Sequence, residues 1–209
     1  MNVLNALAVA GFLVGAMLTA HPAGAVTFED LEAHMDRSQA ELAKFRSALA
    51  DDNPDRRRAA MEFLLKSDDP VLVRLAKEAG LNSPDIQIQK AALRAIFDRN
   101  PRLRVQVQMD GPETEHLIGW IEGSLEGSVE GKTAFFYLLV GEYNSQLECW
   151  SPYKQKGCLI YLADNTATLE VRNAKIPLKL NENGLMTGLV LYEWSEHRAN
   201  LKSMIDLME

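Results

Sequence analysis

The sequence has few of the residues on which catalysis and metal binding most often depend. Among its 209 residues there are two cysteines and four histidines, and no stretch matches G-x-S-x-G, C-x-x-C or a Walker phosphate loop. His34, His116 and His197 do not have the spacing of zinc ligands. The sequence therefore gives no support for an enzyme, and we expect neither a cofactor nor a bound metal.

No apolar run is long enough to span a membrane comfortably. The longest, residues 6–20, has about fifteen residues, against the roughly 20 that a spanning helix needs. It is followed by Pro22 and by the small residues Ala23 and Ala25, as in a secretory signal. Residues 1–25 are therefore predicted to be cleaved, leaving a periplasmic or secreted chain from Val26 without membrane insertion. An uncleaved N-terminal anchor is the alternative. Because no Lys or Arg precedes the run, the signal is weak or the true start lies upstream.

Basic residues are scarce in the second half of the chain. Residues 105–209 hold 15 acidic and 8 basic side chains, whereas residues 26–104 are balanced, so the second half carries the whole net charge of −7. Phosphate backbones are bound by clustered Lys and Arg. Nucleic acid is therefore not expected as a partner.

The two cysteines, Cys149 and Cys158, are predicted to form a disulfide, because an even number of cysteines in an exported chain is typical of one. Eight residues separate them, which is not the spacing of a redox motif. Free or metal-bound thiols are the alternative.

The first half has the periodicity of helices. A weak capping box at Thr27 and Asp30 precedes a stripe with alternating spacings of four and three residues, which predicts a helix of about twenty residues. The stripe consists of Leu31, Met35, Ser38, Leu42, Phe45 and Leu49. Three shorter helices are predicted after Asn53-Pro54, Asp69-Pro70 and Ser83-Pro84, where a capping side chain precedes proline. Gly80 and Pro101 are predicted to end the second and third of them.

Two segments of these helices are similar to each other, with the sequences RRAAMEFLL at 57–65 and QKAALRAIF at 89–97. Together with helix starts at which proline neighbours an acidic residue, these two segments make residues 50–97 resemble HEAT-type helical repeats. This resemblance implies an α-helical HEAT-like subdomain at 26–102 that serves as a protein-binding scaffold. A plain four-helix subdomain without a partner is the alternative. Arg56, Arg57 and Arg58 lie beside three aspartates, which favours a local ion-pair face over an anion-docking patch.

The second half changes to a period of two. Glycine or an apolar residue occupies every second position from Gly119 to Gly131, which predicts a strand with Trp120, Glu122, Glu126 and Glu130 facing water. Further strands are predicted at 133–140, 147–150, 158–163, 166–172, 175–180 and 185–194. Pro177 suggests that its strand lies at a sheet edge, and Leu201, Met204, Ile205 and Met208 predict a last helix from Ser195. The fold class is therefore α+β, with a small antiparallel β-sandwich or barrel and a C-terminal helix at 103–209.

The candidate recognition residues are Trp120, Trp150, Tyr153, Lys154 and Lys156. The last four lie between the two cysteines, and a stapled loop with Trp, Tyr and Lys has the composition of a binding loop. Packing of Trp150 on the disulfide is the alternative. We therefore expect a non-catalytic protein-interaction or scaffold module of the bacterial cell envelope that binds another envelope protein. The alternatives are a small-ligand-binding β-barrel protein and an acidic inhibitor of a basic envelope hydrolase. The sequence gives no oligomeric state.

Overall fold

The computed structural model of the chain describes residues 27–109, 114–172, 174–194 and 197–209, so the expected signal at 1–25 lies outside the described residues. The chain divides into two compact units, one ending at Gln39 and the other spanning Ala40–Glu209. Of the helices in the described residues, none has the length and hydropathy needed to cross a membrane.

The first helix, α1 (Phe28–Leu49), begins at the predicted capping box. The Thr27 hydroxyl donates to a carboxylate oxygen of Asp30 at 2.7 Å and accepts from the Asp30 backbone N–H at 3.1 Å. The Thr27 backbone N–H donates to the same carboxylate. These hydrogen bonds lower the pKa of Asp30, because they favour its charged form.

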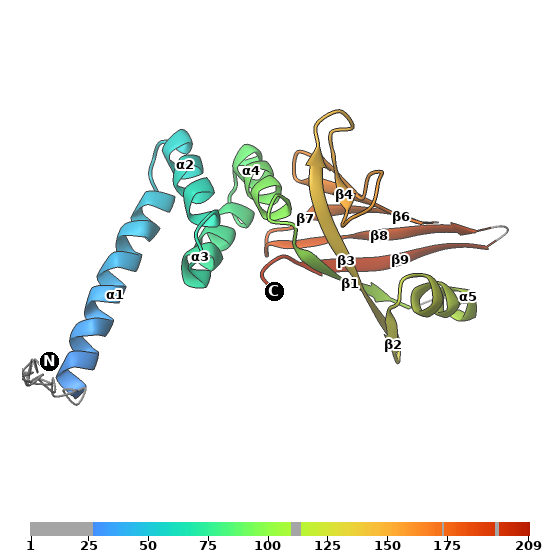
Figure 1. Ribbon diagram of the computed structural model, residues 1–209, viewed down its shortest axis with the longest axis horizontal. Coiled ribbons are helices and arrows are strands. Elements are labelled where there is room, and N and C mark those ends of the chain that lie inside the picture. Colours follow the sequence, from blue (N-terminus) through green and yellow to red (C-terminus); the bar gives the residue numbers. More distant parts are fainter. Residues whose placement is uncertain (1–26, 110–113, 173, 195–196) are drawn as a thin grey trace, which may run out of the picture. The chain divides into compact units, whose positions relative to one another are not determined.

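Three helices of twelve residues follow, namely α2 (Pro54–Leu65), α3 (Pro70–Leu81) and α4 (Ile86–Phe97) (Figure 1). Asn53 and Asp69 cap α2 and α3 through their side chains, as predicted. The cap of α4 is Asp85 and not Ser83, since the Asp85 carboxylate accepts from the Gln87 N–H at 2.8 Å. The Ser83 hydroxyl instead accepts from the Asp85 backbone N–H.

Gly80 was predicted to end α3, but it lies inside the helix, which ends at Leu81. A Cβ on Gly80 would overlap the Sδ of Met61 and lie 2.6 Å from the Cβ of Ala92. The glycine is therefore needed for close packing of α3 against α2 and α4. The sequence did not indicate this role, because a glycine near the end of a helix is usually interpreted as its terminator.

The rest of the fold, apart from a short helical segment between β1 and β2, is one antiparallel sheet that closes on itself. Each strand from β3 to β9 pairs with the next, and β1 pairs with both β9 and β3, while the short β2 pairs with β3. The strands are β1 (Arg102–Gln108), β2 (Ser128–Glu130), β3 (Thr133–Asn144), β4 (Cys149–Pro152), β5 (Ile160–Ala163), β6 (Thr166–Val171), β7 (Ala174–Leu180), β8 (Leu185–Trp194) and β9 (His197–Asp206). The α+β class is confirmed. Of the two predicted alternatives, a sandwich and a barrel, the sheet is a barrel, because β1 pairs with both β9 and β3 and so closes it.

Helices α2 to α4 and the closed sheet share one hydrophobic core. Alternate residues of the strands are buried, as in the pattern of Leu103, Val105 and Val107 on β1. Several contacts attach the helices to one end of the sheet, and two of them involve α4 and α3. Phe97 of α4 packs on a tryptophan of β4, and the Lys77 ammonium of α3 donates to the Leu207 carbonyl at 2.5 Å. Burial there lowers the pKa of Lys77.

The predicted glycine-rich strand at 119–131 is wrong for most of its length. Residues Thr114–Gly119 form helix α5, Trp120–Ser124 form the π-helical turn η1, and only Ser128–Glu130 are a strand. Leu117, Trp120 and Ile121 are buried together. Spacings of three and four place these three on one side of a helix, whereas a strand would put Trp120 and Ile121 on opposite faces.

Two further expectations are corrected at the end of the chain. The predicted C-terminal helix is strand β9, paired with β8 along ten residues, and its buried side chains alternate at Leu201, Ser203 and Ile205. The strand that contains Pro177 is not an edge strand, since β7 lies between β6 and β8. The β7–β8 register skips Ile176 and Pro177, so the proline is accommodated by an interruption of the pairing.

Candidate recognition surface

The predicted disulfide is confirmed. Cys149 and Cys158 are bonded, with their Cα atoms 5.7 Å apart. The bond joins the start of β4 to the residues just before β5 and closes the loop that contains four of the five candidate recognition residues. A disulfide favours an oxidising, extracytoplasmic setting.

Replacing both Cys149 and Cys158 with serine is expected to lower the free energy of unfolding by about 2.7 kcal/mol, because the unfolded chain regains the entropy of a ten-residue loop. Urea unfolding of the double variant, followed by circular dichroism, measures the loss. Adding a reductant to the parent chain should give the same midpoint as the variant. A midpoint identical to that of the oxidised parent would contradict the prediction.

The two candidate tryptophans are buried and belong to the core. Trp150 is 1% exposed and Trp120 is 3% exposed. The expectation that Trp120 faces water is therefore wrong, and for Trp150 the structure favours the alternative of a packing residue. The Trp150 ring packs edge-on against Phe97 at 5.3 Å and beside Tyr143 at 4.9 Å between centroids. Its indole N–H donates to the Asp98 carboxylate at 2.9 Å. Trp150 therefore joins β4 to the end of α4.

Trp120 is placed by η1 and not by a strand. Its ring lies 5.0 Å from the Tyr192 ring and 6.1 Å from the Phe136 ring, measured between centroids. The turn thus inserts an aromatic side chain against β3 and β8. This position makes Trp120 a packing residue of the sheet interior.

The other three candidates, Tyr153, Lys154 and Lys156, are exposed. The Lys154 ammonium lies over the Tyr153 ring, 5.0 Å from its centroid. The Tyr153 backbone N–H donates to the Leu139 carbonyl at 2.9 Å, which places the loop directly beside β3. The exposed part of the stapled loop therefore continues onto the outer side of the sheet.

On that outer side, two arginines of β1 are stacked on aromatic rings of β3. The Arg102 guanidinium lies 3.8 Å from the centroid of Tyr137, and Arg104 lies 4.1 Å from that of Phe135. The β1–β3 register causes this stacking, because it pairs Arg102 with Leu139 and Arg104 with Tyr137. Leu139 and Tyr137 are both exposed. We call this set of residues the aromatic–arginine surface; it consists of Arg102, Arg104, Tyr137, Leu139 and Tyr153.

The sequence did not identify the aromatic–arginine surface. Its members come from three segments, and only the register of β1 against β3 and the contact of Tyr153 with Leu139 bring them together. The signal present in the sequence was the alternation of arginine with apolar residues in Arg102-Leu103-Arg104-Val105. That pattern predicts outward arginines but not the rings on which they lie.

The two largest of the hollows found along the sheet in the described residues lie at different places. One, of about 480 Å³, is lined on β1, β8 and β9 by Gln106, Gln108, Thr187, Gly188, Leu189, Lys202, Ser203 and Met204. The other, of about 830 Å³, lies between the α3–α4 connection and the turns of the sheet. Its lining includes five side-chain amides, Asn82, Gln89, Asn165, Asn181 and Asn183. Asn165 donates to the Gln89 amide oxygen at 2.9 Å across this hollow.

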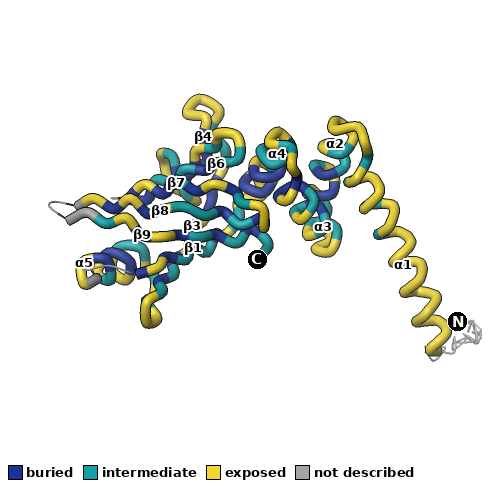
Figure 2. The backbone as a smooth tube through the Cα atoms, turned by 180° about the vertical axis from the view of Figure 1, so that it is seen from behind, coloured by how far each residue is buried: buried dark blue, intermediate teal, exposed yellow. Residues whose placement is uncertain are grey.

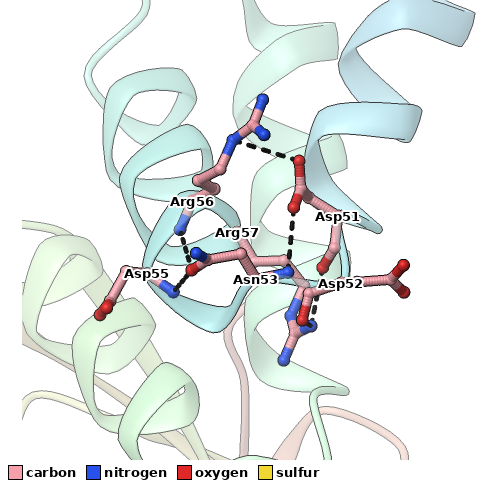
Figure 3. Close-up of polar contacts among 6 residues, drawn as sticks. All are labelled: Asp51, Asp52, Asn53, Asp55, Arg56 and Arg57. Atoms are coloured by element: carbon pink, nitrogen blue, oxygen red, sulfur yellow. Dashed lines mark hydrogen bonds and ion pairs between the residues drawn. The ribbon is translucent and has the colours of Figure 1, made fainter.

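Arg56 and Arg58 form the local ion-pair face that the sequence favoured, and Figure 3 shows Arg56 and Arg57 with the neighbouring aspartates. Arg56 contacts the Asp51 carboxylate at 3.3 Å, and Arg58 contacts Asp55 at 3.4 Å. Arg57 donates to the backbone carbonyl of Asp51 at 2.7 Å and to that of Asp52. Arg57 thus holds the residues that follow α1 against the first turn of α2.

The described residues contain no group of three or more His, Cys, Asp or Glu side chains arranged to hold a metal ion. The carboxylates predicted to share one strand face are dispersed, since Glu122 lies in η1, Glu126 in the following turn and Glu130 in β2. Comparison of the chain with models of protein families, with curated proteins and with solved structures finds no match.

Proposed function

We propose that the protein is a non-catalytic, exported protein-binding module of the bacterial cell envelope, and that the aromatic–arginine surface is where it binds. One observation carries this proposal, namely the stacking of Arg102 on the exposed ring of Tyr137, beside the half-buried pair of Arg104 and Phe135. Arginine and tyrosine are enriched among the residues that contribute most to protein–protein affinity.

The stacking favours binding for a physical reason. An exposed arginine loses rotamer freedom when a partner fixes it, at a cost of about 0.5–1.5 kcal/mol per side chain. Contact of the guanidinium with an aromatic ring orders the side chain before binding. In addition, the pairing of β1 with β3 holds both rings in fixed positions. A surface ordered in this way reduces the entropy that association removes.

The charge of the surface indicates the kind of partner. Arg102 and Arg104 lie there with Lys154 close to Tyr153, although the second half of the chain is acidic overall. Arg104 is itself 3.5 Å from the side-chain carboxylate of Glu209. The expected partner is an envelope protein that presents acidic side chains next to an apolar residue, which would contact Tyr137 and Leu139.

Other features support export and a scaffolding role. The Cys149–Cys158 disulfide and the predicted signal at 1–25 support a periplasmic or secreted location. The resemblance of residues 50–97 to HEAT-type repeats supports protein binding, and the common core of helices and sheet makes the platform rigid. A ligand inside the closed sheet is less supported, because buried side chains such as Phe136 and Ile160 fill inward positions.

Site-specific photo-crosslinking tests the proposal in cells. A photoreactive phenylalanine replaces Tyr137, and the matched control replaces Tyr161, another exposed tyrosine on strand β5. We expect a discrete protein adduct from position 137 and none of that mass from position 161. With the purified partner, Arg102→Ala should weaken binding about tenfold or more, whereas Tyr161→Ala should not.

Three outcomes would overturn the assignment. The same adduct from both positions, or unchanged affinity of Arg102→Ala, would place the binding surface elsewhere. A basic hydrolase as the crosslinked partner would favour the inhibitor interpretation instead.

A further inference from the structure

Helix α1 carries a row of large apolar side chains that lie in solvent. Phe28, Leu31 and Met35 are 71%, 45% and 49% exposed, and of the side chains described along α1 none is buried. Figure 2 shows the helix largely in the colour of exposed residues. Single exposed apolar residues are ordinary on protein surfaces, but a contiguous row of them marks a site of interaction.

The row repeats every seven residues. Its members are separated alternately by three and four positions. They occupy positions a and d of three successive heptads and position a of the next, where a is the first and d the fourth residue. They are Phe28, Leu31, Met35, Ser38, Leu42, Phe45 and Leu49. A seven-residue period keeps one stripe facing a second helix only if the two helices supercoil, which is the geometry of a coiled coil.

We propose that the α1 helices of two copies of this chain associate in parallel as a short two-stranded coiled coil. This inference is independent of the aromatic–arginine surface. The part of α1 available for this pairing is its N-terminal part, because Phe45 and Leu49 already pack partly against the core of the unit Ala40–Glu209. The contact is therefore short, and the dimer is expected to exchange with monomer as concentration changes.

The flanking charges agree with a parallel arrangement. In a parallel pair, each position g lies beside the position e five residues further along the second copy. Glu41 then meets Arg46 of the second copy, twice by symmetry, and His34 meets Gln39. Antiparallel pairing of the segment 31–49 instead brings the two Glu41 carboxylates together.

Charge also argues against a lipid surface as the occupant. Helices that lie on anionic membranes are rich in Lys and Arg on their polar face. The exposed first half of α1 has the opposite composition, with four acidic residues, Glu29, Asp30, Glu32 and Asp36, and only Arg37 as a cation. A second copy of α1 would bury the apolar row, and this contact does not require Lys or Arg residues beside the row.

Sedimentation equilibrium of the full chain tests the association. We expect a concentration-dependent mass that rises toward that of a dimer. Leu31→Glu should leave a monomer over the same range, whereas Ala33→Glu, on the outer position of the heptad, should not change the dissociation constant. Ser38→Leu replaces the polar d residue and should tighten the dimer about tenfold or more. Because these side chains are exposed, the circular dichroism of all variants should match that of the parent.

Crosslinking through an added cysteine tests the orientation. In the parallel pair, Ser38 of one chain faces Ser38 of the other. Ser38→Cys should therefore form an intermolecular disulfide, visible as a dimer on a non-reducing gel. The control Ala40→Cys points outward in the heptad and should not. Both native cysteines are already paired with each other, so they do not compete in the intact chain. A chain that stays monomeric at the highest attainable concentration, or a dimer insensitive to Leu31→Glu, would overturn the proposal; a dimer that Ser38→Cys fails to link would overturn its parallel form.

Discussion

A Gly188→Ala chain is expected to lose about 3 kcal/mol or more of unfolding free energy, at the upper end of the cost of overpacking. A Cβ at this position would overlap the Pro177 carbonyl oxygen and lie 2.9 Å from its carbonyl carbon and 3.1 Å from the Leu178 Cα. All three atoms belong to the backbone of β7, so no side-chain rotation relieves the contact. Strands β7 and β8 would have to separate, close to where Pro177 already interrupts their pairing.

Urea unfolding measured by far-UV circular dichroism gives the size of this effect. The matched control is Gly119→Ala, because a Cβ there meets no atom within 4 Å and the backbone has the helical angles φ −59° and ψ −35°. That change should stabilise the protein by about 0.5–1 kcal/mol, since alanine loses less conformational freedom than glycine in a helix. Equal midpoints for the two variants would contradict the close approach of β7 and β8.

Trp150→Ala is expected to lower the free energy of unfolding by about 3–5 kcal/mol, as for other large-to-small changes of a buried aromatic residue. The change removes ring contacts with Phe97 and Tyr143 and the hydrogen bond to Asp98. It therefore weakens the attachment of α4 to the sheet as well as the local packing. Trp150→Phe keeps most of the ring contact, so it should lower the free energy of unfolding by clearly less than Trp150→Ala.

Thermal and urea unfolding of Trp150→Ala and of Tyr153→Ala separate the two roles predicted for the stapled loop. Tyr153 is exposed, and its replacement should change stability by no more than about 0.5 kcal/mol. Partner capture, in contrast, should fall for Tyr153→Ala if the loop forms part of the aromatic–arginine surface. A Trp150→Ala chain with native stability would mean that the indole is not a core group.

Local signals in the sequence predicted the helices and most strands of this fold. Proline after a capping residue located α2 and α3, and Asp85 instead of Ser83 caps α4 because proline lies just before the cap. Asp164-Asn165, a pair of residues typical of two-residue hairpin turns, joins β5 to β6, and Asp164 has a positive φ of 53°. Strand β8 has the predicted bounds of 185–194.

The errors lie where partners distant in the sequence decide the local structure. The stripe of Leu201, Met204 and Ile205 fits a helix, but pairing with β8 and β1 makes the segment a strand. Glycine at alternate positions between 119 and 131 suggested a strand, whereas Trp120 and Ile121 are buried by a helical turn. Composition alone does not distinguish these outcomes, because short apolar runs fit both periods.

The candidate site was predicted in part for the same reason. The disulfide and the exposure of Tyr153, Lys154 and Lys156 follow from local composition. The burial of Trp150 depends on α4, some fifty residues earlier, through Phe97 and Asp98. Likewise, the stacking of Arg102 on Tyr137 depends on a register that no single segment encodes.

The pairing of β1 with β9 makes completion of the ring depend on the last residues of the chain. Val105 pairs with Ile205 and Val107 with Ser203, so this contact joins residues 96 to 100 positions apart. While the chain emerges in order from its N-terminus, β1 lacks one neighbour and β8 presents an open edge, and such edges recruit other chains. Contacts this distant in sequence also form slowly, because a long loop must close first. The closed sheet thus cannot form stepwise as the chain is synthesised. A chain shortened before β9 would keep two unpaired edges, which favour aggregation or capture by a chaperone.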